Sequence, residues 1–276
     1  MRGERAYSAE PMPLQSDVVV DIGHVAVRLR TIDRTLVRIL HRRFHRFLNP
    51  SATPDFDFEV TVVDRGESDP DRDLQVSGGG GMWTIVRGDF KAEWNVAARR
   101  GRIWQTASPF AIDSLLRVVH TLVLASDGGF LLHASSAIRD GRAFVFTGPS
   151  GAGKSTIVGL APRDVTVLTD EISYLRRVGD RFVAFGTPFA GERGDLGEPA
   201  TAPVAALFRL GRGPDNARDR LDDARTVQTL LRNILFFADD RTLVDRVLES
   251  ACEFAARVPA YDLRFAPDAR VWSAIS

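Results

Sequence analysis

The chain has 276 residues, with 36 basic and 36 acidic side chains, a formal net charge of zero and 44% hydrophobic residues. This length and apolar content predict one large globular domain or two smaller ones, and they exclude a largely disordered chain. The balanced charge argues against a nucleic-acid-binding protein, whose sequence would carry a basic excess. The single cysteine, Cys252, excludes an internal disulfide framework and a zinc site built from two or four cysteines.

Neither a membrane span nor a targeting segment stands out in the sequence. No apolar run reaches the roughly 18 residues that span a bilayer, and residues 1–15 lack the apolar stretch of a signal peptide. We therefore expect a cytoplasmic protein without membrane contact. Among the basic residues 34 are arginines and only two are lysines, Lys91 and Lys154, and the two residue types differ chemically.

The first part of the chain is predicted to form a mostly antiparallel sheet with a helix. Residues 1–15 show no periodicity and are expected to be a loose terminus. A helix capped by Thr31 or Asp33 is predicted to run to about Phe47, and the turn-rich residues 65–81 are expected to form a loop. Strands are expected from apolar alternation over residues 17–30, 56–62, 82–87, 90–96 and 102–106.

A domain boundary is predicted at the end of a second, apolar helix. Ser108 followed by Pro109 predicts its start, and the helix should run to about Ala125, where Asp127-Gly128-Gly129 stops it. We place the boundary there. Residues 1–125 are expected to form an N-terminal α+β domain of unknown role, and residues 126–276 a second domain with the phosphate-binding loop described below.

The second domain has the pattern of an α/β protein. A continuous apolar strand is predicted at residues 143–147, of the kind that is buried on both faces, and a second buried strand is predicted at residues 165–169. Further strands are expected over residues 130–138, 174–177, 181–185, 204–210 and 261–265, and helices over 156–160, 224–237 and 241–257.

Residues 148–155 read GPSGAGKS and fit the pattern G-x-x-x-x-G-K-[ST] of a phosphate-binding loop. The glycines allow several amide N–H groups to turn inward around a phosphate, and the helix that follows adds its positive dipole end. Lys154 is expected on the β- and γ-phosphates, and the Ser155 hydroxyl on Mg²⁺. With ATP and Mg²⁺ as ligands, the expected nucleotide-binding residues are Gly148, Pro149, Ser150, Gly151, Ala152, Gly153, Lys154, Ser155 and Thr156.

An acidic pair, Asp170-Glu171, follows the next predicted strand. Ligands gather at the carboxyl ends of strands in open α/β sheets, and Mg²⁺ prefers carboxylate oxygen as well as phosphate. We therefore expect a metal site made of Ser155, Asp170 and Glu171. Asp170 could bind the metal, accept the proton of a substrate hydroxyl, or do both.

The segment HASSAIRDGRAFVFTGPSGAGKST, followed by Asp170-Glu171, resembles the HPr serine kinase/phosphorylase family. The shared features are a histidine that opens a strand, a glycine-marked hairpin, the phosphate loop, and a short helix before an acidic pair. The resemblance covers residues 130–175 well and residues 176–265 loosely, where 186–192 and 258–265 look like a shorter, divergent branch of the family. It implies an α/β phosphate-loop kinase core similar to that of phosphoenolpyruvate carboxykinase.

The activity that the resemblance implies is ATP- and Mg²⁺-dependent transfer of the γ-phosphoryl group to a serine hydroxyl of a protein or peptide. It implies Asp170 as general base, Lys154 and Glu171 as further catalytic residues, and His133 near the phosphates. Members of the divergent branch often lie beside genes for modified peptides, which implies a ribosomally made peptide as acceptor.

Two positions depart from the family pattern. The second acid of the pair is usually aspartate, whereas this chain has Glu171. Glu192 and Arg193 stand where the family carries an arginine- and glycine-rich signature. Two alternatives stay open: a small-molecule kinase on the same core, and a non-catalytic ATP-binding regulator whose N-terminal domain is an interaction module. No nucleic-acid partner is expected, and a homo-oligomer and a preference for ATP or GTP are left open.

Other candidate residues have simpler interpretations. From its pattern alone, His133 on an apolar strand is a packed core histidine, and only the resemblance brings it to the phosphates. His41 and His45 share a helix face with arginines and are expected on a solvated basic surface that could dock an acidic partner or a phosphate. The three tryptophans Trp83, Trp94 and Trp104 are expected to pack within the first sheet.

Two further predictions concern the second domain. Cys252 lies among apolar residues of the last predicted helix and is expected to be buried and inert. Arg212 and Arg218 fall in residues 211–219, which are expected to form a mobile exposed loop from which they could reach a transferred phosphate.

Overall fold

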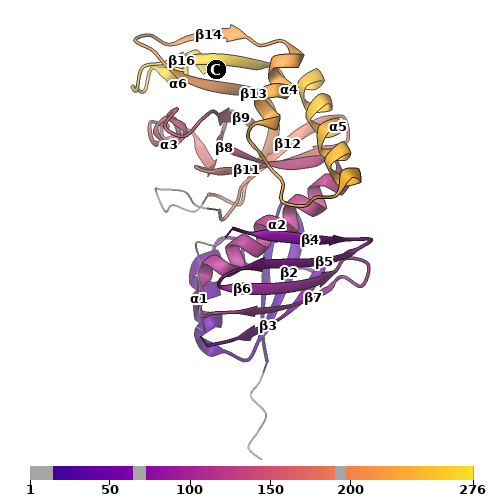
Figure 1. Cartoon of the computed structure of the whole chain (residues 1–276). Coiled ribbons are helices and arrows are strands. Elements are labelled where there is room, and N and C mark those ends of the chain that lie inside the picture. Colours follow the sequence, from indigo (N-terminus) through magenta and orange to yellow (C-terminus); the bar gives the residue numbers. More distant parts are fainter. Residues whose placement is uncertain (1–14, 65–72, 190–196, 276) are drawn as a thin grey trace, which may run out of the picture.

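A computed structural model describes residues 15–64, 73–189 and 197–275 of the chain. Within these residues the protein is mixed α/β, with two mixed sheets of seven and nine strands. Figure 1 shows the first sheet and the second sheet as separate layers with a long helix, α2, between them. Of the loose terminus predicted for residues 1–15, only residue 15 is among the described residues. The candidates Glu192 and Arg193 both lie outside them.

The first sheet has the strand order β1-β2-β3-β7-β6-β5-β4. Its pairs are antiparallel except β2–β3 and β3–β7, which are parallel, so the sheet is mostly antiparallel, as predicted, with two parallel pairs. The predicted strands are confirmed, and one strand, β4, lies within the residues predicted to be a loop. The strands are β1 (Ser16–Ile22), β2 (Val25–Thr31), β3 (Phe56–Val62), β4 (Gln75–Gly79), β5 (Met82–Arg87), β6 (Phe90–Asn95) and β7 (Arg100–Gln105).

Helix α1 (Arg34–Phe44) covers this sheet. Asp33 is its N-cap, because its Oδ1 accepts a hydrogen bond of 2.7 Å from the Leu36 N–H. Leu36, Leu40 and Phe44 are fully buried on one face, as the periodicity predicts. The helix ends three residues before the predicted Phe47, which lies in the following turn.

Helix α2 (Pro109–Asp127) begins and ends where the sequence predicts. The Ser108 side chain caps it, and Gly128 ends it in the left-handed conformation (φ 77°) that glycine adopts without strain. By length and hydropathy α2 could also cross a membrane, which counting apolar runs did not reveal. However, 67% of the qualifying window is buried in this protein, and core helices meet the same criterion.

The second sheet is built around two long strands, β8 (Gly129–Arg139) and β13 (Thr201–Arg212). The first half of β8 pairs with β11 and β15, and its second half pairs with β9 and β10. The other strands are β9 (Arg142–Thr147), β10 (Thr166–Thr169), β11 (Ile172–Val178), β12 (Arg181–Phe185), β14 (Ala217–Arg220), β15 (Ile234–Leu235) and β16 (Ala260–Phe265).

Three predictions about the strands and helices of this half are wrong. The strand at residues 165–169 is not buried throughout, because β10 lies at the sheet edge with Thr166 exposed. The helix predicted over residues 224–237 ends at Leu231 as α4 (Asp223–Leu231), since Ile234 and Leu235 pair with β8 instead. Arg212 and Arg218 lie in β13 and β14 and not in a loop.

The remaining helices are α3 (Lys154–Gly159), α5 (Arg241–Arg257) and α6 (Val271–Ile275). Figure 1 shows α3 and α5 at opposite sides of the second sheet. Cys252 on α5 is exposed, contrary to prediction, because the buried face of α5 carries Val247, Ala251 and Phe254. Helix α6 was not predicted, and its Trp272 donates a hydrogen bond of 3.0 Å to the Ile157 carbonyl of α3.

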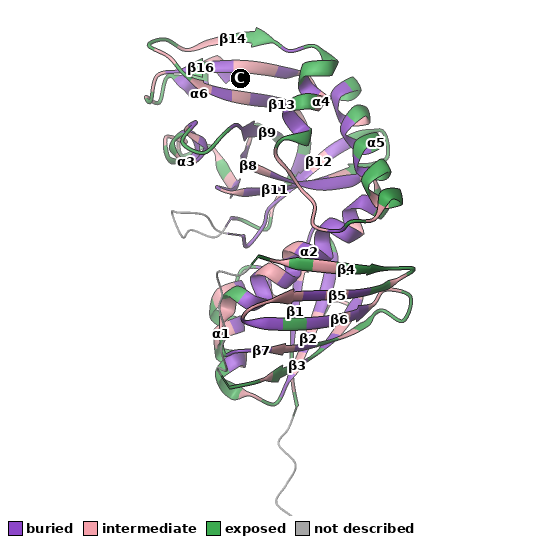
Figure 2. Ribbon diagram, in the orientation of Figure 1, coloured by how far each residue is buried: buried purple, intermediate pink, exposed green. Residues whose placement is uncertain are grey.

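One buried cluster spans both sheets. It joins α1 and α2 to the inner face of the first sheet and extends to residues of the second sheet such as Leu131, Tyr174 and Phe185. Figure 2 shows that most of α2 between Ala111 and Ala125 is buried. Trp83 and Trp94 pair across β5 and β6 within this core, as predicted, whereas Trp104 is only half-buried. Helix α2 therefore packs at the junction between the two sheets.

Candidate functional site

The phosphate-binding loop, residues 148–155, connects the buried strand β9 to α3. Gly151 (φ 77°) and Gly153 (φ 105°) have positive φ values that other residues resist. Gly153 is also constrained by packing, because a Cβ there would lie 2.7 Å from the Phe265 ring. Helix α3 has only six residues, so its dipole is weak. The amides of the loop and the Lys154 charge would therefore attract a phosphate more strongly than the helix dipole would.

Lys154 lies inside the curve of this loop. Its side chain is buried, and its Nζ donates hydrogen bonds to the carbonyls of Gly148 (2.9 Å) and Pro149 (3.3 Å). The buried Ser135 hydroxyl of β8 donates to the Lys154 carbonyl at 3.1 Å. The ammonium group is therefore fixed against the start of the loop, next to the amides that could hold a phosphate.

The other predicted loop residues differ in exposure. Ala152 is buried and Ser155 is half-buried, whereas Pro149, Ser150 and Thr156 are exposed. Of the two predicted arginines, Arg212 donates a hydrogen bond of 3.0 Å to the Gly151 carbonyl. Arg218 instead donates to the Ile275 carbonyl and lies over the Tyr261 ring. Only Arg212 therefore contacts the loop.

The acidic pair follows β10. Strands β9 and β10 both pair antiparallel with β8, so they run in the same direction and their carboxyl ends lie at the same edge of the sheet. The Thr169 hydroxyl shapes the turn there by accepting hydrogen bonds from the N–H groups of Glu171 (3.3 Å) and Ile172 (3.2 Å). Asp170 is buried, with 5% of its surface exposed. The topology thus brings the glycine-rich loop and the acidic pair to one edge.

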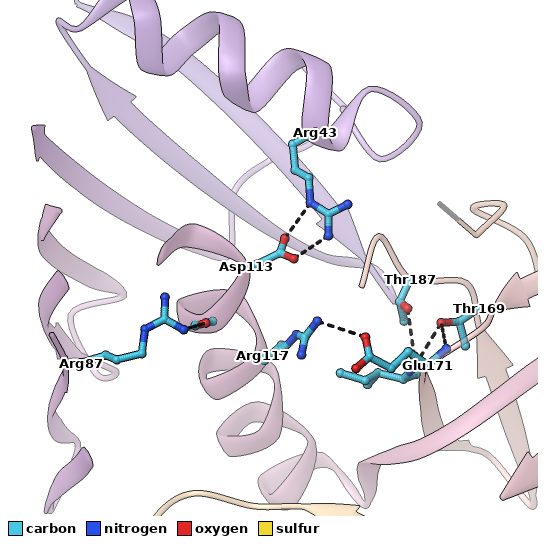
Figure 3. Close-up of polar contacts among 9 residues, drawn as sticks. Arg43, Arg87, Asp113, Arg117, Thr169, Glu171 and Thr187 are labelled. Atoms are coloured by element: carbon cyan, nitrogen blue, oxygen red, sulfur yellow. Dashed lines mark hydrogen bonds and ion pairs between the residues drawn. The ribbon is translucent and has the colours of Figure 1, made fainter. Parts of the chain in front are cut away.

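Glu171 contacts a residue that the sequence did not single out. The guanidinium Nη2 of Arg117, on α2, lies 3.5 Å from Glu171 Oε2, as Figure 3 shows. Burial raises the pKa of Glu171 above its usual value, and the Arg117 charge opposes that rise. Arg117 also lies over the Phe189 ring at 5.3 Å. The arginine therefore helps to keep a partly buried carboxylate ionised.

A second ion pair connects this contact to the first sheet. Arg43 of α1 donates two hydrogen bonds to the carboxylate of Asp113, and its Nε lies 3.2 Å from Oδ1. Asp113 is buried and lies one helical turn before Arg117 on α2 (Figure 3). Asp113 is 70 positions from its partner in the sequence, and Arg117 is 54 positions from its partner. The only sign of these contacts in the sequence is therefore the four-residue spacing of Asp113 and Arg117 in an apolar helix.

His133 lies on β8 between the loop and the acidic pair. Its carbonyl accepts a hydrogen bond of 3.0 Å from the Thr147 hydroxyl, just before the loop, and it pairs with Ile172, just after Glu171. The pKa of His133 is lowered first by burial and then by the positive charges of Lys154 and Arg117. Burial and these two charges therefore disfavour the protonated imidazole at this position.

The donor groups at this edge suit Mg²⁺ in a phosphate complex. Mg²⁺ bound with phosphates usually takes one or two protein carboxylates together with phosphate oxygens and waters. A hydroxyl from Ser155 and one or both carboxylates of the acidic pair match that donor set. Within the described ranges, no group of three or more His, Cys, Asp or Glu side chains gathers to hold a metal ion, and the exposed His41 and His45 of α1 belong to no such group.

Among curated proteins none matches significantly. Solved structures that match include the Hpr(Ser) kinase/phosphatase from Coxiella burnetii, with 11% identity and a TM-score of 0.27 over 50% of this chain and 80% of that chain, which is a distant similarity. The profile of the family described as "SynChlorMet cassette protein ScmC" matches residues 105–276, more than half of the chain. The protein thus belongs to the ScmC family.

Proposed function

We propose that this protein binds Mg²⁺·ATP at the phosphate-binding loop and transfers the γ-phosphoryl group to a serine hydroxyl of a protein or peptide. The observation that carries the proposal is the common direction of β9 and β10. Their shared edge joins a G-x-x-x-x-G-K-S loop, containing a buried lysine, to a buried aspartate. That combination suits phosphoryl transfer, which depends on positioning and charge neutralisation.

Each residue has a defined task in the proposed reaction. The loop amides and Lys154 hold the β- and γ-phosphates. The acceptor hydroxyl oxygen attacks the γ-phosphorus, the bond from that phosphorus to the β–γ bridging oxygen breaks, and ADP leaves. The hydroxyl proton passes to the carboxylate of Asp170. Ser155 and the acidic pair would hold Mg²⁺, which would supply positive charge for the phosphate oxygens.

Arg117 acts as a positioning residue in this proposal. It faces Glu171 at 3.5 Å and holds the side chain at one place while its charge favours the ionised form. Burial and the charges of Lys154 and Arg117 lower the pKa of His133, so a further positive charge is disfavoured next to this pair. A serine acceptor, as distinct from another hydroxyl, rests on the resemblance to HPr serine kinase.

The test uses the two lysines of the chain as a matched pair. Lys154→Ala should abolish ATP binding in isothermal titration calorimetry, because the ammonium inside the loop is lost. Lys91→Ala should leave it unchanged, because Lys91 lies on an exposed strand position and pairs with Glu93 at 2.7 Å. Unchanged ATP affinity in Lys154→Ala would overturn the proposal.

Transfer is tested separately from binding. Incubation with γ-labelled ATP and Mg²⁺, together with the peptides and proteins encoded beside this chain, should label a serine that mass spectrometry locates. Asp170→Asn should bind ATP and fail to label. Label on a small hydroxyl compound alone would indicate a small-molecule kinase, and ATP binding with no transfer to any acceptor would indicate a regulator.

A further inference from the structure

The outer face of α1 carries a row of unpaired arginines. Arg34, Arg38 and Arg42 follow each other at four-residue intervals, on the side opposite the buried Leu36 and Leu40. All three are exposed. No ion pair connects any of them to another residue in the part of the chain that the structure describes, and Arg38 makes only a hydrogen bond of 3.2 Å to the Thr35 hydroxyl.

This row does not stabilise the helix that carries it. Like charges four residues apart repel each other. Arg34 lies in the first turn, where acidic residues are favoured and where α1 has none. The chain as a whole has zero formal net charge, so the row is a local accumulation and not part of a generally basic protein. Such a separation of charge is typical of a surface that binds an acidic partner.

The row ends beside Arg43, which contacts α2. Arg43, next to Arg42, turns inward to Asp113 on α2, and Arg117, one turn further, contacts Glu171 (Figure 3). Phe110 lies on the same side of α2 as Asp113 and Arg117, at a spacing of three and seven residues, and 67% of its surface is exposed. We call Arg34, Arg38, Arg42 and Phe110 the α1–Phe110 surface.

We propose that the α1–Phe110 surface docks an acidic segment of the polypeptide acceptor, with an apolar side chain of that segment against Phe110. This inference rests on the proposed function. Successive arginines of the row are about 6 Å apart along the helix axis, and alternate residues of an extended peptide are about 6.6 Å apart. A peptide with an acidic residue at every second position therefore matches the row, and the exposed phenyl ring gives it an apolar contact that phosphate groups would not use.

The test measures docking without nucleotide. The probe is a fluorescein-labelled peptide of about twelve residues, long enough in extended form to cover the row, with glutamate at alternate positions, one phenylalanine and one serine. Fluorescence anisotropy should show binding that weakens with salt, and no binding of the matched peptide with glutamine in place of glutamate. The triple variant Arg34→Gln, Arg38→Gln, Arg42→Gln should lower the affinity about tenfold, since three exposed charge contacts are lost.

A control variant carries the same change of charge elsewhere. Arg241→Gln, Arg246→Gln, Arg257→Gln removes three exposed arginines of α5 and should leave the affinity unchanged. Phe110→Ala should weaken binding of the probe but not of a probe in which alanine replaces phenylalanine. Because Phe110 is exposed, this substitution should not unfold the protein.

Several results would overturn the inference. One is an equal loss of affinity in the α1 and α5 triple variants. Another is binding of the glutamine peptide with the same affinity as the glutamate peptide. A third is tighter binding of a single-stranded oligonucleotide or of phosphatidylserine vesicles than of the acidic peptide. Failure of the proposed function is distinguishable, because ATP binding is measured separately. A protein that binds ATP but not the acidic peptide refutes docking alone, and one that binds the peptide but not ATP refutes the kinase proposal.

Discussion

The phosphate-binding loop and the α2 junction are built in different ways. The loop depends on its own backbone: three glycines with positive φ and a lysine bonded to the carbonyls of Gly148 and Pro149 lie within eight residues. The junction depends on side chains from distant segments, with Arg43 reaching Asp113 and Arg117 reaching Glu171. Damage to the loop should therefore affect ligand binding at one place, whereas damage to the junction should affect the packing of both sheets.

The largest effect should come from a methyl group added to the loop. In Gly153→Ala the new Cβ combines a positive φ of 105° with a contact of 2.7 Å to the Phe265 ring. We expect a loss of about 3 kcal/mol in the free energy of unfolding, from backbone strain and overpacking together, and loss of ATP binding. Urea denaturation and calorimetry measure the two effects.

Gly141→Ala is the matched control for this substitution. Gly141 also has a positive φ, 69°, but nothing lies within 4 Å of its added Cβ. The Gly141→Ala variant should lose only about 1 kcal/mol in the free energy of unfolding and keep its ATP affinity. Equal losses in the two variants would show that the Phe265 contact contributes nothing to the shape of the loop.

The next largest effect concerns the junction. Asp113→Ala removes a buried carboxylate and leaves Arg43, whose side chain is only 18% exposed, without its partner. We expect a loss of about 2 to 3 kcal/mol in the free energy of unfolding. Glu198→Ala breaks the Arg46–Glu198 pair, in which the side chains are 41% and 48% exposed, and should cost less than about 1 kcal/mol. A cost for Glu198→Ala as large as for Asp113→Ala would contradict this distinction.

The same contrast explains what the sequence could predict. The loop, the strand before it and the caps of α1 and α2 were predicted because each depends on a few adjacent residues, such as Asp33 with Leu36 or Ser108 with Pro109. Alternation of apolar residues located most strands, although it could not indicate that β2, β3 and β7 are parallel neighbours.

What was missed depends on contacts between distant segments. Ile234 and Leu235 continue the helical period of α4, yet pairing with β8 makes them a strand. Arg117 meets Glu171 across 54 positions, and Arg43 meets Asp113 across 70. No local pattern encodes such pairs, because the positions that face each other are set only when α2 packs between the two sheets.

The effect that is smallest at neutral pH is a pH dependence of stability at the junction. His120 of α2 is fully buried against Tyr174, and neither ring nitrogen has a hydrogen-bond partner among the described residues. Burial, assisted by the Arg176 charge, lowers the pKa of His120 from 6.5 to about 3. The folded protein therefore keeps this imidazole neutral at pH values where the unfolded chain protonates it, so stability should fall as the pH drops below 6.5 toward 3.

The slope of this loss is about 1.4 kcal/mol per pH unit for one proton. His120→Leu should remove it, and should leave stability at pH 7.5 unchanged or higher, because no hydrogen bond is lost. Part of the slope should remain, since the pKa of His133 is also lowered. Urea denaturation at pH 7.5, 6 and 5 measures the difference, with the exposed His45→Leu as control. Identical slopes in the wild type and His120→Leu would mean that His120 is protonated in the folded junction, and the packing of α2 against Tyr174 would have to open to admit water.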